Sequence, residues 1–346
     1  MKNKGVKSLK LKETVKWLIK AFVACVIAFA IVTGCSAFYY NIPVHFENTT
    51  GATDYKWESR RYSRCIEGFT FGKINNDGFN NLDDLGNKKI DILFMGSSHG
   101  EAFNVLPENS CAAQMNKMLD GEKYVYNIAT AGHTLSHLCR NLNNALDTYK
   151  PAEYVILECP NVVLKEKNLA EAVDGTLPVI KSETGFLISI LQKNPYLRLL
   201  YSQFTNVKAS KTDVEETVSA PATVLKDNGN YCDTLKRFID KIKTDSNNHN
   251  VTPIIVYHPQ LGINEDGSVQ LLHSDNEIKK FADICQQSGV LFVDMSEDFV
   301  NGYEKNHKLP YGFNNTVAGE GHLNAYGHNL IAKKILEVIK DGEAAK

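Results

Sequence analysis

Short apolar runs alternate with longer amphipathic stretches along most of the chain. Apolar runs of this length between polar turns are typical of strands buried on both faces. They predict strands at residues 89–95, 124–130, 154–158, 252–257 and 290–294. Apolar positions at helical spacing predict helices at residues 108–120, 133–148, 275–287 and 324–340, with Leu135, Leu138, Leu142 and Leu146 sharing one face. This alternation predicts a three-layer α/β domain with a parallel sheet.

Two stretches interrupt the alternation. Residues 45–88 are rich in Asn, Asp, Gly and aromatic residues without a sustained period, and they predict a connector before a domain over residues 89–346. Residues 161–228 are more polar than their surroundings. They predict an insertion near the strand ends, where substrate-binding loops collect.

An uncharged, largely apolar segment covers residues 21–44. As a helix it would rise about 36 Å, which is enough to cross a hydrocarbon core of about 30 Å. Residues 1–20 carry seven lysines and one acidic residue, Glu13. Because basic flanks stay in the cytoplasm, we expect a cytoplasmic tail, a single-pass transmembrane helix in the cell membrane, and a body outside it.

The same segment allows a second interpretation. Val32-Thr33-Gly34-Cys35 resembles a bacterial lipobox, and the apolar stretch before it has the length of a signal segment. In that case the body is a lipoprotein anchored at Cys35. Both alternatives place the body at the outer face of the membrane.

Composition and charge exclude several classes of protein. With 43% apolar and 23% charged residues, the chain is neither disordered nor a small disulfide scaffold. Beyond residue 20 it carries 31 basic and 39 acidic residues, so there is no bulk basic charge to bind nucleic acid. The eight cysteines show no C-x-x-C pair or spacing typical of a metal site. The spacing does not choose a disulfide pairing.

Two short segments carry candidate chemistry. Gly96-Ser97-Ser98-His99-Gly100 follows the first predicted strand directly, where a serine on a tight turn can project its hydroxyl from the sheet. Glu320-Gly321-His322 precedes the last predicted helix. A serine nucleophile needs a base such as histidine and an acid that holds the imidazole, and these two segments together offer all three groups.

With these residues in this order, the chain resembles the SGNH, or GDSL-type, hydrolase family, whose members have a flavodoxin-like α/β fold. Gly96-Ser97-Ser98 matches the family's Gly-Asp-Ser block with Ser97 in place of Asp, which makes Ser98 the implied nucleophile. His322 matches the family's histidine and is the implied base. Glu320 is the implied acid, because an acid two residues before the histidine is similar to the alginate O-acetyltransferase branch; the family's usual Asp position holds Gly319.

The resemblance also implies an oxyanion hole. Gly132 falls where the family has a glycine after the second strand. In Cys159-Pro160-Asn161-Val162, Asn161 alone agrees with the family's Gly-x-Asn-Asp block. Together with the Ser98 amide, these groups would stabilise the developing oxyanion. No metal or organic cofactor is implied.

The implied function is a membrane-anchored, extracytoplasmic serine esterase or O-acyltransferase that acts on acyl esters, foremost acetyl esters, of cell-envelope glycans. The implied partners are an envelope polysaccharide, the membrane and a membrane acyl-donor protein. The departures at positions 97, 162 and 319 leave open an inactive SGNH-fold subunit that binds glycan or serves as a scaffold. Residues 96–100 also satisfy Gly-x-Ser-x-Gly, which leaves open an α/β-hydrolase with Asp294 as the acid.

Overall fold

The computed structural model describes residues 2–41, 46–47, 53–54, 61–160, 168–177, 194–201, 230–272 and 275–344. Contacts along the chain separate two units. The first, here called the anchor unit, comprises Met1–Asn41 and Thr184–Ala222. The second, here called the α/β unit, comprises Ile42–Glu183 and Thr223–Lys346, and it holds every described residue of the candidate site.

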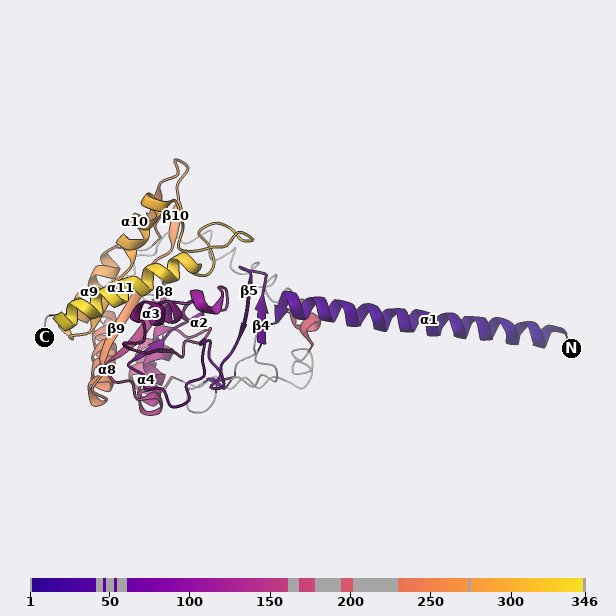
Figure 1. The fold of residues 1–346 in the computed structure, drawn as a ribbon, viewed down its shortest axis with the longest axis horizontal. Coiled ribbons are helices and arrows are strands. Elements are labelled where there is room, and N and C mark those ends of the chain that lie inside the picture. Colours follow the sequence, from indigo (N-terminus) through magenta and orange to yellow (C-terminus); the bar gives the residue numbers. More distant parts are fainter. Residues whose placement is uncertain are drawn as a thin grey trace. The chain divides into compact units, whose positions relative to one another are not determined.

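A five-stranded parallel sheet forms the centre of the α/β unit (Figure 1). Its strands are β6 (Ile92–Met95), β7 (Val125–Asn127), β8 (Tyr154–Pro160), β9 (Thr252–His258) and β12 (Leu291–Asp294). They are arranged in the order β12-β9-β8-β6-β7. Counted along the chain this is the 2-1-3-4-5 order of flavodoxin-like sheets. The predicted fold class is confirmed, and each predicted strand overlaps an observed one.

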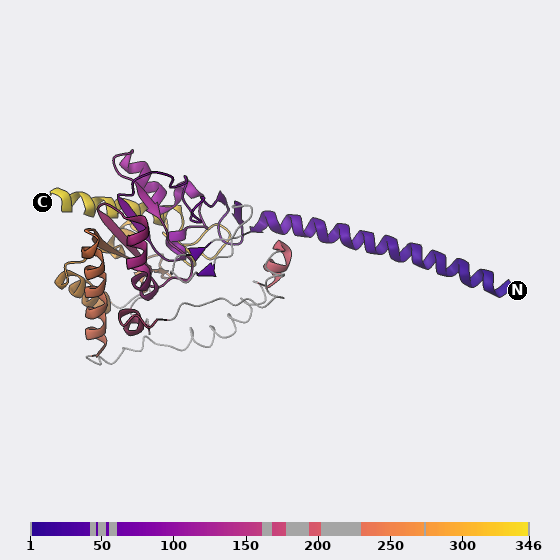
Figure 2. The ribbon, with the colours of Figure 1, turned by 90° about the horizontal axis from the view of Figure 1, so that it is seen from below.

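Helices cover both faces of the sheet, because its central strands bury side chains on both faces. On one face Ile92 and Phe94 pack with residues of three helices, and on the other Leu93 and Met95 pack chiefly with residues of three long helices. The first set is α3 (Cys111–Leu119), α10 (Ser296–Asn306) and α11 (Ala325–Ala344). The second set is α4 (Leu135–Tyr149), α8 (Asn230–Asn248) and α9 (Asp275–Gln287). Figure 2 shows the unit from below.

The face predicted for α4 is the one that is buried. Leu135, Leu138, Leu142 and Leu146 are each at most 3% exposed. They pack in the same core cluster as Leu93 and Val155 of the sheet. Burial of a leucine stabilises the fold by about 1.5–3 kcal/mol, so this apolar stripe is enough to dock the helix.

The stretch before the sheet is more than a connector. From residue 61 on it belongs to the α/β unit and forms an antiparallel pair, β4 (Arg61–Arg64) and β5 (Thr70–Lys73). Its apolar side chains Tyr62, Ile74 and Phe79 are each at most 3% exposed. Tyr62 and Ile74 pack together with Phe103, whereas Phe79 packs in the α4-side core, so these contacts follow no regular period in the sequence. The predicted insertion at residues 161–228 lies mostly outside the described residues; α5 (Leu169–Val173) packs on the α4 side of the core.

Helix α1 (Lys2–Tyr39) belongs to the anchor unit and is continuous (Figure 1). Its segment Lys12–Tyr39 has 28 residues, is largely exposed, and is apolar enough to cross a membrane. At 1.5 Å per residue this segment measures about 42 Å. A signal sequence near an N-terminus has the same properties, so the helix is compatible with both interpretations of the predicted anchor at residues 21–44.

Candidate active site

The candidate nucleophile lies on a tight turn at the carboxyl end of β6. The strand leads through Gly96 and Ser97 into the single-turn helix α2 (Ser98–Glu101), and Ala102 ends this helix in a left-handed conformation with φ 62°. The Ser97 hydroxyl caps the helix by accepting a hydrogen bond from the His99 amide at 3.2 Å. This geometry makes Ser98 the first residue of the helix, with a backbone N–H that has no intrahelical acceptor.

Ser98 and His322 come together as predicted, although they lie 224 residues apart. The distance from Ser98 Oγ to His322 Nε2 is 2.9 Å. His322 lies on the loop before α11, which is fixed by a bridge between Tyr311 and Leu323. The imidazole side chain is 24% exposed and Ser98 is half-buried, so the pair is partly open to solvent.

The carboxylate that contacts His322 is that of Glu67. Its two oxygens lie 2.8 and 2.9 Å from His322 Nδ1, and the His322 backbone amide donates to the same carboxylate at 2.7 Å. A carboxylate can only accept, so Nδ1 carries the proton and Nε2 is left to accept from the Ser98 hydroxyl. Serine, histidine and acid are therefore arranged in series, as in serine hydrolases.

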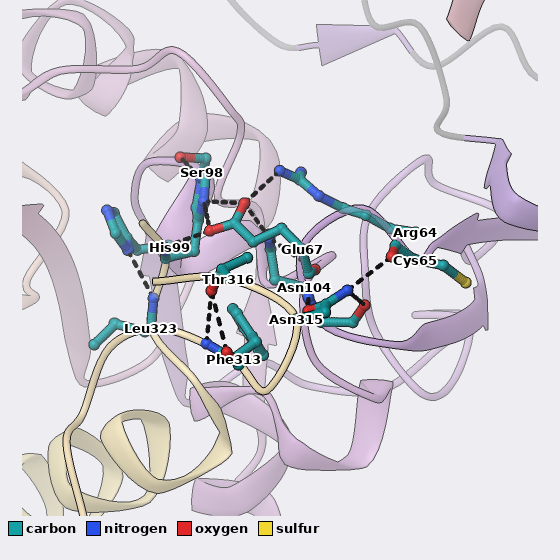
Figure 3. Close-up of polar contacts among 12 residues, drawn as sticks. Arg64, Cys65, Glu67, Ser98, His99, Asn104, Phe313, Asn315, Thr316 and Leu323 are labelled. Carbon is teal, nitrogen blue, oxygen red and sulfur yellow. Dashed lines mark hydrogen bonds and ion pairs between the residues drawn. The ribbon is translucent and has the colours of Figure 1, made fainter. Parts of the chain in front are cut away.

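Glu67 is itself held by two further donors (Figure 3). Arg64 donates to it at 2.8 Å and Asn104 donates through its side-chain amide at 2.7 Å. Burial on its own would raise the pKa of the Glu67 carboxyl. The hydrogen bonds from His322, with the charges of His322 and Arg64, outweigh burial and lower this pKa to about 2. Glu67 is therefore ionised at neutral pH, as an acid that orients a histidine must be.

Glu320 does not occupy the position predicted for it. It is exposed, and Gly321 follows it with φ 81°. A side chain at position 321 would place a Cβ atom 2.3 Å from Glu67 Oε1, so the glycine leaves room for a carboxylate that arrives from another segment. The structure therefore corrects the acid of the candidate triad from Glu320 to Glu67. Nothing in the local sequence separates the two, because each is a glutamate followed by glycine.

Asn315 joins the Glu67 segment to the His322 loop. Its side-chain oxygen accepts from the Gly68 amide at 2.9 Å, and its side-chain nitrogen donates to the Cys65 carbonyl at 2.8 Å (Figure 3). These bonds connect positions about 250 residues apart in sequence. They hold Glu67 and the loop that carries His322 in one fixed arrangement.

The candidate oxyanion donors are only partly described. Gly132 lies in the loop after β7 with φ 82°, and this loop is bonded to the nucleophile turn by the Thr130 amide, which donates to the Gly96 carbonyl at 3.0 Å. The Ser98 amide is at the start of α2. Asn161, the third predicted donor, lies outside the described residues.

Asp294 serves another purpose than that of a triad acid. Its carboxylate accepts from the Ser296 amide at 2.9 Å and from the Ser296 hydroxyl at 2.5 Å, at the start of α10. It lies at the end of the edge strand β12. This contradicts the alternative of an α/β-hydrolase with Asp294 as the acid. The carboxylate that contacts His322 belongs to Glu67, which precedes Ser98 in the sequence.

Within the described ranges, no group of three or more His, Cys, Asp or Glu residues could hold a metal ion. The eight cysteines, all of them in described segments, form no disulfide.

Three comparisons place the chain beside known proteins. No protein-family model matches the chain. No curated protein matches it either. Among solved structures it resembles the esterase EstA of a Pseudoalteromonas species, with 14% identity over 73% of this chain and 98% of that one and a TM-score of 0.38. It also resembles the acetyl xylan esterase AlAXEase, with 14% identity over 72% and 100% and a TM-score of 0.41.

A third similar structure is a protein of Slackia heliotrinireducens that is assigned to the SGNH hydrolases, with 15% identity over 73% of this chain and 100% of that one and a TM-score of 0.39. Two of these similar structures are thus named as esterases and one as an SGNH hydrolase. At such identities and scores, these likenesses transfer no activity to the chain.

Proposed function

We propose that the chain is a membrane-anchored serine esterase or O-acyltransferase with the triad Ser98, His322 and Glu67. The observation that carries the proposal is the continuous series of contacts from Ser98 Oγ to His322 Nε2 at 2.9 Å and from His322 Nδ1 to Glu67 at 2.8 Å. An inactive binding subunit would have no need of a correctly oriented base next to an accessible serine hydroxyl.

The geometry supports a two-step acyl transfer. Ser98 Oγ attacks the ester carbonyl while His322 Nε2 takes the hydroxyl proton, and the resulting imidazolium is stabilised by Glu67. His322 then returns the proton to the leaving alcohol, and an acyl-serine remains. Water or an acceptor hydroxyl attacks this ester in the second step with His322 again as base. The Ser98 and Gly132 amides and the Asn161 side chain are the proposed donors to the oxyanion.

The proposed substrates are acyl esters, foremost acetyl esters, of cell-envelope glycans. One feature of the described residues supports this class: the apolar helix Lys12–Tyr39, which is long enough to hold the enzyme at a membrane. On this proposal the partners are an envelope polysaccharide and a membrane acyl-donor protein. Hydrolysis and transfer share the acyl-serine and differ in whether water or a sugar hydroxyl takes the acyl group.

The test uses the full-length chain in detergent and a fluorophosphonate probe. We expect the probe to label the wild type at Ser98, as read by peptide mass spectrometry, and not to label Ser98→Ala. Ser268→Ala removes an exposed serine hydroxyl on a distant turn and should be labelled like the wild type. Absence of labelling in the wild type, or labelling that persists in Ser98→Ala, favours the inactive-subunit alternative.

A second measurement separates hydrolase from transferase. The wild type is incubated with p-nitrophenyl acetate, with and without oligosaccharide acceptors. Free acetate alone identifies an esterase, whereas acetylated sugar identifies a transferase. Ser98→Ala should give neither product above background.

A further inference from the structure

A buried carboxylate lies directly beneath the turn that carries Ser98. Glu158, near the end of β8, is 2% exposed. Its Oε2 atom accepts from the Ser97 amide at 2.6 Å, from the Ser97 hydroxyl at 3.0 Å and from the Gly100 amide at 3.3 Å. These donors lie on both sides of Ser98. Since β8 is the direct neighbour of β6 in the sheet, the carboxyl end of β8 lies beside the nucleophile turn.

The other side of this carboxylate is closed by a histidine. Glu158 Oε1 lies 2.5 Å from His258 Nε2, and His258 Nδ1 lies 2.5 Å from the Tyr311 hydroxyl. All three side chains are at most 2% exposed. Burial would raise the pKa of Glu158, but the hydrogen bond and charge of His258 outweigh it and lower this pKa. Glu158 is therefore a buried anion whose oxygens are fully engaged, which is the condition under which a buried charge is tolerated.

Gly96 and Gly100 leave the space that the Glu158 carboxylate occupies. A Cβ atom at position 96 would lie 2.4 Å from Glu158 Oε2, and one at position 100 would lie 3.0 Å from it. Neither glycine has a positive φ, so the lack of space, and not the backbone conformation, excludes a side chain there. The turn and the carboxylate thus form one packed assembly.

We propose that Glu158 is a positioning residue that holds the Ser98 turn in register with His322. In the Gly-Asp-Ser block of similar hydrolases the residue at the position of Ser97 is an aspartate. Here the carboxylate comes from Glu158 on β8 instead. This inference rests on the proposed function, since it concerns the same serine. Glu158 makes no hydrogen bond to Ser98 Oγ or His322 among the contacts of the described residues. It therefore acts through the backbone of the turn and leaves the proton transfer to His322.

Relocating the charge tests the proposal. Glu158→Gln keeps the shape of the side chain and removes its charge, and we expect kcat and the rate of fluorophosphonate labelling to fall about 10- to 100-fold, the size of effect that a misplaced reacting group produces. KM and the pH midpoint of kcat/KM should stay unchanged, because Glu158 is buried away from substrate and the His322–Glu67 pair is intact. Ser97→Asp/Glu158→Gln returns a carboxylate to the turn and should recover most of the lost rate.

The matched control is Ser97→Asn/Glu158→Gln, which has the same shape without the charge and should recover nothing. Wild-type kcat in Glu158→Gln, or equal rates in the two double variants, would overturn the proposal. Circular dichroism and Tm verify that each variant folds. If Glu158→Gln does not fold, Glu158→Asp takes its place: it keeps the charge but withdraws it from the turn, and wild-type kcat in this variant would overturn the proposal as well.

Hydrogen exchange separates failure of this inference from failure of the proposed function. If the wild type does not react with the probe, the proposed function fails, but the amides of Ser97 and Gly100 still report on the turn. Faster exchange of these two amides in Glu158→Gln than in the wild type supports the positioning role. Unchanged protection contradicts it.

Discussion

At the scale of single residues, the site depends on the orientation of the His322 ring and on which of its nitrogens carries the proton. Its two ring nitrogens face different partners, a serine hydroxyl and a carboxylate, so one tautomer satisfies both contacts. The ring is fixed further by the backbone amide of His322, which donates to the same carboxylate. A glutamate that binds both the ring and the backbone of one residue controls orientation as well as charge.

Replacing Glu67 therefore tests the assignment of the acid. In Glu67→Gln the amide can present a donor to Nδ1 and favour the wrong tautomer, so we expect kcat to fall on the order of 10²- to 10⁴-fold with KM little changed. Glu320→Gln is the matched control: the same substitution at an exposed position should keep wild-type turnover. Both are measured with p-nitrophenyl acetate at neutral pH. Loss of turnover in Glu320→Gln and not in Glu67→Gln would return the acid role to Glu320.

The same carboxylate links stability to pH. Its pKa is lowered from its ordinary value of 4.5 to about 2 in the folded chain. The ionised form is thus favoured by folding, so its contribution is complete above about pH 4.5 and is lost as the pH falls towards 2. We expect the difference in Tm between the wild type and Glu67→Gln to be largest above pH 5 and to shrink below it. A difference that stays constant down to pH 2 would mean that folding does not stabilise the Glu67 charge.

At the scale of elements, the turn between β6 and α2 has no room for added atoms. A methyl group at Gly100 would lie 2.9 Å from both the Ala129 and Phe94 side chains. Gly100→Ala should therefore destabilise the chain by about 1–3 kcal/mol, the usual effect of overpacking a core. Gly342→Ala in α11 is the matched control, since its Cβ would meet nothing within 4 Å. It should be neutral or stabilise by up to about 1 kcal/mol. Thermal unfolding measures both changes.

The elements also show what the sequence alone could reveal. The strands of the sheet were predictable because each contains a short apolar run, and α4 because its leucines recur at helical spacing. Helix α8 was not predicted, although Leu235, Phe238 and Ile242 recur with the same period and are buried. The serine and histidine were predictable because each follows or precedes a regular element. Glu67 was not, because its role arises from contacts with residues about 250 positions away.

At the scale of the whole molecule, the chain combines an apolar helix with an α/β unit that holds the candidate active site. Trp17, Phe22 and Ile31 of α1 are at least 60% exposed. Exposed apolar side chains over this length are costly in water and are accommodated by lipid. On the proposed topology, the lysines in the N-terminal part of α1 would keep this end in the cytoplasm and the α/β unit outside. The site and its substrates would then meet at the outer face of the membrane.

The proposed topology predicts how the chain is anchored in the membrane. The Cys35→Ser variant distinguishes a retained helix from a lipid anchor at Cys35. If α1 is retained as the anchor, the wild type and Cys35→Ser both stay in the membrane fraction after alkaline carbonate extraction, and the intact mass of each equals that of the uncleaved chain. Protease added to intact cells should digest the α/β unit in both, since the lysine-rich end stays inside. A wild type that begins at Cys35 and carries lipid, with Cys35→Ser left unprocessed, would instead establish the lipoprotein alternative. Protection of the α/β unit from external protease would contradict both, because each of them places the Ser98–His322 pair outside the cytoplasm.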